Sequence, residues 1–184
     1  DTWFSSGLWT FSTLGWPNES DDMRHFHPAT LLETGYDILF FWVARMILMT
    51  QFALGDIPFK NVYLHGLVRD AQGRKMSKSL GNNMDPLDVA QKYGADAARM
   101  ALIVGNSPGT DLRISEDKIK GYKHFANKLW NIARFILERT DEAPGEILPS
   151  DVPLIEELTA LRKDVTEDLD AYRAYMAAEK LYHY

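Results

Sequence analysis

The residues best suited to chemistry in this sequence are two lysines, Lys75 and Lys78, which stand three positions apart. Ser77 and Ser79 alternate with them, and a Gly-Asn pair ends the run. Each ammonium group is a compact charge with three donors, and hydroxyl and backbone N–H groups add more. Such a loop suits a polyphosphate, whose charge it could stabilise as a leaving group departs. The alternative is a solvent-exposed basic turn, because lysine is usually exposed.

The elements on either side should place these lysines on a loop. The apolar run Val62–Val68 predicts a short buried strand. Asp85 followed by Pro86 predicts the start of a helix, with the aspartate as N-cap. The lysines would then lie between a strand and a helix, at the carboxyl end of the strand. Open α/β sheets bind ligands at that edge.

Composition limits the class of protein. The 184 residues are 46% hydrophobic, which allows one domain with a real core, or one domain and a piece of another. The absence of cysteine excludes disulfides and cysteine-ligated metals. A net charge of −6 argues against a protein that coats nucleic acid. His25 and His27 alternate without a third ligand, so we expect surface histidines and no protein-ligated metal.

Neither end of the sequence has the features expected of a natural terminus. Asp1 is not an initiator, no leader follows it, and Tyr184 lies inside an uncapped helical pattern. We therefore interpret the chain as a piece of a longer, cytoplasmic protein.

A second candidate site precedes the lysine loop. Ala29–Gly35 predicts a buried strand, and the apolar run 36–49 follows it. The run is shorter than the ~20 apolar residues of a membrane span and contains Asp37 and Arg45, so we expect a helix buried on most of its faces. Asp37 is placed to accept from a ribose hydroxyl, or else only to cap the helix.

The rest of the chain is predicted to be helical. Helices are expected over 85–93 and 94–104, and another begins at the N-cap Ser115 and runs to Thr140. A linker over 141–153 and a last helical region over 154–184 follow, which predicts a helical hairpin that opens a bundle. The fold class is therefore α/β, followed by an all-α segment.

Several segments resemble one known family. Lys75–Ser79 reads KMSKS, which is the signature loop of the class I aminoacyl-tRNA synthetases. The run TGYDILFFWVARM from Thr34 and the aromatic start DTWFSSG resemble the valyl-tRNA synthetases among them. Isoleucyl enzymes carry an aspartate where Ser5 stands, which favours valine.

The resemblance implies a set of site residues. Lys75 and Lys78 would be catalytic, and Trp3 and Trp42 would line the amino-acid pocket. ATP would be bound by Lys75, Ser77, Lys78, Ser79, Gly35, Asp37, Gly66 and Leu67. The implied reaction converts valine and ATP, with Mg²⁺, into valyl-adenylate, and the valyl group then passes to tRNA(Val). No membrane is expected, and the parent is expected to be a monomer.

The resemblance also implies a division into domains. Residues 1–114 would be the C-terminal half of a Rossmann-like parallel-sheet catalytic domain, with the KMSKS loop and the stem-contact region. Residues 115–184 would be the first helices of the anticodon-binding bundle, the all-α hairpin.

The sequence departs from the family in one respect. The family's His-x-Gly-His signature and its editing insertion are absent, so the isolated chain is expected to be inactive and to bind ATP weakly. The alternatives are a fragment of an isoleucyl-tRNA synthetase and a non-catalytic module, derived from a synthetase, that binds RNA or a partner.

Overall fold

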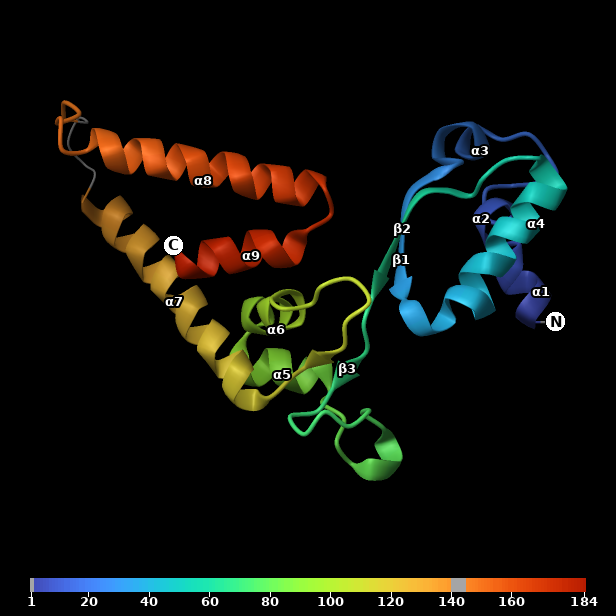
Figure 1. Ribbon diagram of the computed structural model, residues 1–184, viewed down its shortest axis with the longest axis horizontal. Helices are drawn as coiled ribbons and strands as arrows, with labels where there is room; N and C mark the ends of the chain where they lie inside the picture. The colour runs from blue at the N-terminus through green and yellow to red at the C-terminus, as the bar shows by residue number, and fades with distance from the viewer. Residues whose placement is uncertain (1, 140–144) are drawn as a thin grey trace. The chain divides into compact units, whose positions relative to one another are not determined.

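The computed structural model describes residues 2–139 and 145–184, and these form two compact units (Figure 1). Unit 1 extends to Leu67 and also includes Pro108–Asp111, which return to it from later in the chain. Unit 2 consists of Val68–Ser107 and the described residues from Leu112 to Tyr184.

Unit 1 is built on two parallel strands. The strands β1 (Ala29–Gly35) and β2 (Phe59–His65) pair with Leu32 opposite Val62 and Gly35 opposite His65. Parallel strands need a crossover connection. Here a 3-10 turn, a π-helical turn and the helix α4 (Ala44–Leu54) supply it. The predicted strand over 29–35 is confirmed.

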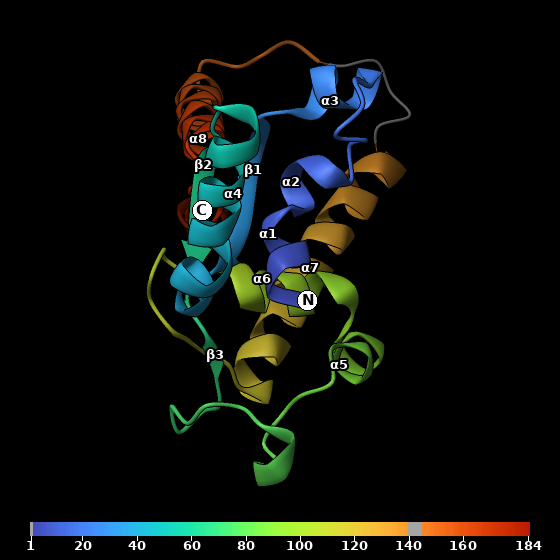
Figure 2. The ribbon, with the colours of Figure 1, turned by 90° about the vertical axis from the view of Figure 1, so that its right-hand side faces the viewer.

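Three short helices precede β1: α1 (Thr2–Gly7), α2 (Trp9–Ser12) and α3 (Asp21–Phe26). The first two lie along α4 (Figure 2). The Thr10 and Thr50 hydroxyls, buried and 3.0 Å apart, join α2 to α4 by a hydrogen bond. The core of the unit is Leu32, Val43, Met46 and Phe59. The His27 side chain is only 7% exposed, so the prediction of surface histidines is wrong for it.

The apolar run after β1 differs from the prediction in length and burial. It is helical in three successive forms from Tyr36 to Leu54, which is long and apolar enough to cross a membrane, so the argument from shortness was wrong. The core helices of soluble proteins that meet the same criterion are mostly buried, whereas 17% of the apolar window here is buried. It is not buried on most faces either, since Leu48 is 69% and Phe52 89% exposed. Val43, Met46 and Thr50 are buried.

Unit 2 begins with a short parallel pair, β3 (Val68–Arg69) with β4 (Leu112–Arg113). The strand predicted over 62–68 is thus interrupted: β2 ends at His65, and Gly66 and Leu67 separate it from β3. The helices α5 (Pro86–Tyr93) and α6 (Ala95–Ile103) confirm the two predicted helices. The Asp85 side chain accepts from the Leu87 N–H, as expected of the N-cap.

Three further helices complete unit 2: α7 (Glu116–Arg139), α8 (Val152–Asp170) and α9 (Ala174–His183). Ser115 Oγ accepts from the Lys118 N–H at 3.2 Å, which confirms the predicted start of α7. Its predicted last residue, Thr140, and part of the predicted linker lie outside the described residues. The Tyr182 ring packs against Tyr122 and Phe125, so α9 lies on α7.

The last helical region is two helices, where the sequence predicted one. The break contains Tyr172 with a φ of 58°, in the left-handed region that residues other than glycine rarely adopt. The buried Asp168 forms an ion pair with Lys180 Nζ at 2.7 Å, which holds α9 to α8, and its Oδ1 accepts a hydrogen bond from Arg173 Nε at 2.9 Å. These contacts, the one with Lys180 first, lower the pKa of the Asp168 carboxyl.

Candidate functional site

Lys75 and Lys78 lie where the sequence placed them, in the segment between β3 and α5. Both are exposed. Lys78 opens a single 3-10 turn, Lys78–Leu80, which Ser77 caps by accepting from the Leu80 N–H at 3.3 Å. Gly81, with a φ of +63°, ends the turn. The lysines are therefore carried by a loop with one ordered turn.

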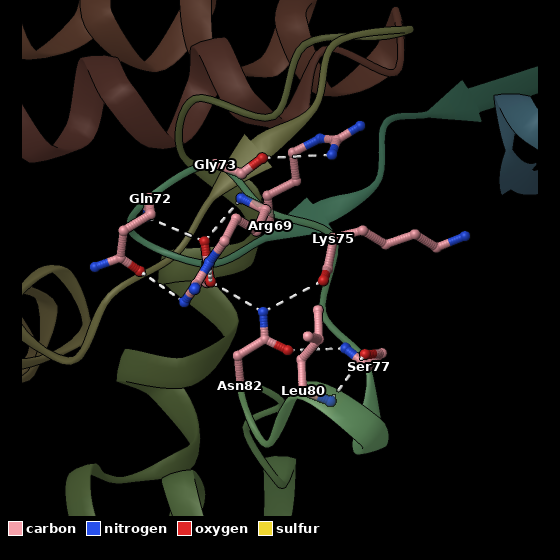
Figure 3. A network of polar contacts seen from close by, with 9 residues as sticks. Arg69, Gln72, Gly73, Lys75, Ser77, Leu80 and Asn82 are labelled. Carbon is pink, nitrogen blue, oxygen red and sulfur yellow. Dashed lines mark hydrogen bonds and ion pairs between the residues drawn. The ribbon is translucent and has the colours of Figure 1, made fainter.

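Met76 is half-buried, whereas its neighbour Lys75 is exposed. It packs against the core of unit 2, together with Met84. The Lys75 side chain extends away from the polar network at the base of the loop (Figure 3). Along the described chain, neither lysine ammonium makes an ion pair or hydrogen bond with another residue. Both charges are thus available to an anionic ligand.

A buried carboxylate organises the base of the loop. Asp70 is 7% exposed. Its Oδ1 accepts from the backbone N–H groups of Gln72 at 3.1 Å and Arg74 at 2.8 Å. Its Oδ2 accepts from Arg74 Nε at 2.7 Å and Asn82 Nδ2 at 2.9 Å. These bonds, the one from Asn82 first, lower the pKa of Asp70 from 3.8 to about 2.

Asn82 connects this carboxylate to the middle of the loop. Its Oδ1 accepts from the Ser77 N–H at 2.9 Å, and its Nδ2 also donates to the Lys75 carbonyl at 3.3 Å (Figure 3). The Ser77 and Ser79 hydroxyls are 3.2 Å apart and hydrogen-bonded. We call Asp70, Arg74 and Asn82 the clasp.

Gly35 and Asp37 lie together at the carboxyl end of β1. A Cβ on Gly35 would lie 2.5 Å from Asp37 Oδ1, so the Asp37 carboxylate, the end of a flexible side chain, would have to turn away from it. Gly35 is itself the N-cap of the turn, which lacks a side-chain cap. Asp37 therefore does not cap the helix, and it is exposed. Its contact with a ribose hydroxyl stays a prediction.

Gly66 is explained by packing within the chain. A Cβ at this position would lie 1.9 Å from the Thr110 carbonyl oxygen. The Leu67 N–H donates to Asp111 Oδ1 at 2.9 Å, and the Tyr36 hydroxyl donates to the same oxygen at 2.9 Å. The segment 108–111 thus fills the space into which a Cβ on Gly66 would point. The predicted part of Gly66 and Leu67 in ATP binding stays a prediction.

The two tryptophans of the predicted amino-acid pocket belong to different helical segments of unit 1. Trp3, in α1, packs edge-on against Phe41, and the Arg45 guanidinium lies over its ring. Trp42 is half-buried and packs against the core of unit 1. A pocket between their rings stays a prediction.

Three residues that shape these sites were not predicted as site residues: Asp70, Asn82 and Asp111. The sequence does draw attention to Asp70, because it is the only acidic residue between Lys60 and Leu80, a stretch rich in lysine and arginine. Among residues 2–139 and 145–184, no group of three or more His, Asp or Glu side chains could hold a metal ion.

The sequence of the chain is similar to those of one known family. Residues 1–115 match the family described as tRNA synthetases class I (I, L, M and V). The chain is 48% identical over 191 aligned residues to a valine–tRNA ligase of Clostridium acetobutylicum, covering 100% of this chain and 22% of that protein. The chain thus spans about a fifth of the length of this relative.

Solved structures show the same fold. The Mycobacterium tuberculosis methionyl-tRNA synthetase in complex with methionyl-adenylate aligns with a TM-score of 0.78 and 28% identity, over 93% of this chain and 35% of that one. The LeuRS–tRNA–LeuAMS complex of Agrobacterium radiobacter K84 aligns with a TM-score of 0.81 and 22% identity, over 98% of this chain and 26% of that one. The α/β fold class is therefore that of class I synthetases, and with the family match over 1–115 this chain belongs to the class I tRNA synthetases of the I, L, M and V group.

Proposed function

We propose that the chain is part of a valine–tRNA ligase. That protein activates valine with ATP to give valyl-adenylate and pyrophosphate, and transfers the valyl group to tRNA(Val). The observation that carries the proposal is the loop with two exposed lysines, held by the clasp in a chain 48% identical to a valine–tRNA ligase. Residues 1–114 would serve the catalytic domain, and residues 115–184 would open the anticodon-binding bundle.

The chemistry assigned to the loop is electrostatic. The valine carboxylate attacks the α-phosphate of ATP, and the bond from that phosphorus to the bridging oxygen breaks. Lys75 and Lys78 stabilise the negative charge that grows on the departing pyrophosphate. Electrostatic stabilisation of this kind is usually the largest single contribution to the rate enhancement of an enzyme. Mg²⁺ would accompany ATP as part of the substrate. The step needs no covalent bond to the protein.

Amino-acid-dependent ATP–pyrophosphate exchange by the full-length protein that contains this chain tests the proposal. We expect exchange with valine at a much higher kcat/KM than with isoleucine. A preference for isoleucine would assign the chain to an isoleucyl enzyme. The absence of exchange with either amino acid would favour a non-catalytic module.

A further inference from the structure

The geometry points to Asp70 and Asn82 as positioning residues that set the place and separation of Lys75 and Lys78 on the loop. This inference rests on the proposed function, because it gives the two lysines their task at the triphosphate. Neither positioning residue needs to touch the substrate.

The hydrogen bonds of Asn82 bracket Met76. Its side-chain amide holds the Lys75 carbonyl on one side of Met76 and the Ser77 N–H on the other. With Met76 packed into the core, the backbone between the two lysines is fixed from the polar and the apolar side. These contacts act on the backbone that joins Lys75 to Lys78.

Asp70 holds Asn82 in the one orientation that permits this. An ionised carboxylate only accepts hydrogen bonds, so it selects the NH₂ end of the Asn82 amide, at 2.9 Å. The amide oxygen then faces the Ser77 N–H. Asp70 is itself fixed by Arg74 and by two backbone N–H groups.

The turn before the lysines belongs to the same arrangement. The Asp70 N–H donates to the Arg74 carbonyl at 3.0 Å, and the Gly73 N–H donates to the Asp70 carbonyl at 2.9 Å. Arg69 and Lys75 then form an antiparallel bridge that continues from β3. Lys75 is thus anchored to a sheet edge, whereas Lys78 depends on the bonds that Asn82 makes.

The expected effect of breaking the clasp follows from this difference. A displacement of about 1 Å at a catalytic group can lower the rate about 100-fold. Asn82→Ala should therefore lower kcat for valine-dependent exchange ~10- to 100-fold and leave the KM for valine within about twofold. The neighbouring Asn83, which is exposed, supplies the matched control. Asn83→Ala should keep the exchange rate of the unchanged protein.

Asn82→Asp distinguishes the loss of the whole side chain from the loss of its NH₂ donor alone. Its carboxylate can still accept from the Ser77 N–H, but it cannot donate to Asp70 or to the Lys75 carbonyl. Two carboxylates would also face each other, so its kcat should fall as far as that of Asn82→Ala. Adding Asp70→Asn supplies an NH₂ donor toward residue 82 and should restore part of the rate.

A thermodynamic cycle distinguishes positioning from folding. If Asn82 acts through the lysines, Asn82→Ala should lower kcat little further in a Lys75→Ala/Lys78→Ala background, because the ammonium groups that Asn82 positions are absent there. Circular dichroism melting of each full-length variant monitors folding. An equal loss of rate in both backgrounds, or a kcat for Asn82→Ala equal to that for Asn83→Ala, would overturn the inference.

The same set of proteins tests the proposed function separately. If the lysine substitutions leave exchange unchanged, the role of the lysines fails, and the positioning inference fails with it. If they slow exchange while Asn82→Ala does not, the role of the lysines stands and only the inference is lost.

Discussion

At the scale of single residues, the two lysines differ in what supports them. Lys75 is bridged to Arg69 next to β3, and Lys78 opens a single turn capped by Ser77. Both side chains are exposed. A charge that acts mainly on the leaving group contributes to the rate more than to substrate binding.

Lys78→Ala in the full-length protein should therefore lower kcat for valine activation about 100-fold and leave the KM for valine nearly unchanged. Single-turnover formation of valyl-adenylate measures the effect. Lys120→Ala, at an exposed position on α7, is the control. An activation rate for Lys78→Ala equal to that of the control would remove Lys78 from the mechanism.

The ionisation of Asp70 gives a prediction about pH. Its pKa in the folded chain, about 2, lies below the ordinary value of 3.8. The folded state therefore prefers the ionised carboxylate, and the stabilisation is complete above about pH 4 and lost as the pH falls toward 2. The difference in urea midpoint between the unchanged chain and Asp70→Asn should be constant from pH 5 to 7 and shrink between about pH 4 and 2.

Asp170→Asn, an exposed acid at the end of α8, supplies the baseline for that series. A difference that persists undiminished at pH 2 would show that the carboxylate charge of Asp70 has no part in the stability of unit 2.

At the scale of elements, glycine positions test the packing. Gly66 faces the Thr110 carbonyl at a distance that admits no Cβ, whereas a Cβ on Gly121, within α7, would meet nothing within 4 Å. Gly66→Ala should destabilise unit 1 by about 3–5 kcal/mol or prevent its folding. Gly121→Ala should stabilise the chain by about 0.5–1 kcal/mol, because alanine favours helix.

Urea unfolding followed by circular dichroism measures both changes. A Gly66→Ala chain as stable as the unchanged one would show that the segment 108–111 does not lie against β2 and its end as described.

The sequence predicted those elements whose limits are marked by local signals. The strand 29–35 lies between Pro28 and the turn at Gly35, and α5 starts at the Asp-Pro pair. The break between α8 and α9 contains no glycine or proline that could have marked it in the sequence. It is instead accompanied by Tyr172 in the left-handed region and by the contacts of Asp168 with Arg173 and Lys180. Those contacts arise only after folding.

The candidate site divides in the same way. The lysines and serines of the loop could be predicted because their types and spacing carry the chemistry. Asp70 and Asn82 could not, because their roles depend on a hydrogen bond between residues twelve positions apart. The explanation of Gly66 likewise requires Thr110, which comes much later in the chain.

At the scale of the whole molecule, the exposed apolar surface is the prominent feature. On α4, Leu48 and Phe52 stand four positions apart on one helix face, 69% and 89% exposed. Exposed apolar groups that lie together bind hydrophobic probes and promote association. Single exposed residues such as Leu87 on α5 are ordinary.

The isolated chain should accordingly bind the dye ANS and sediment as a concentration-dependent mixture. Leu48→Ser/Phe52→Ser should reduce the dye fluorescence, and Leu87→Ser should leave it nearly unchanged. Equal dye binding by all three chains would mean that the α4 face contributes nothing to it.

Because Pro108–Asp111 belong to unit 1, the chain cannot be divided at one point into two complete units. A chain that stops at Leu67 would lack the Asp111 carboxylate, which accepts hydrogen bonds from the Tyr36 hydroxyl and the Leu67 N–H. A chain that starts at Val68 would retain that tetrapeptide without the partners it needs. A single nick therefore cannot yield two intact halves, and proteolytic fragments divided near residue 67 should stay associated or unfold rather than separate as stable pieces.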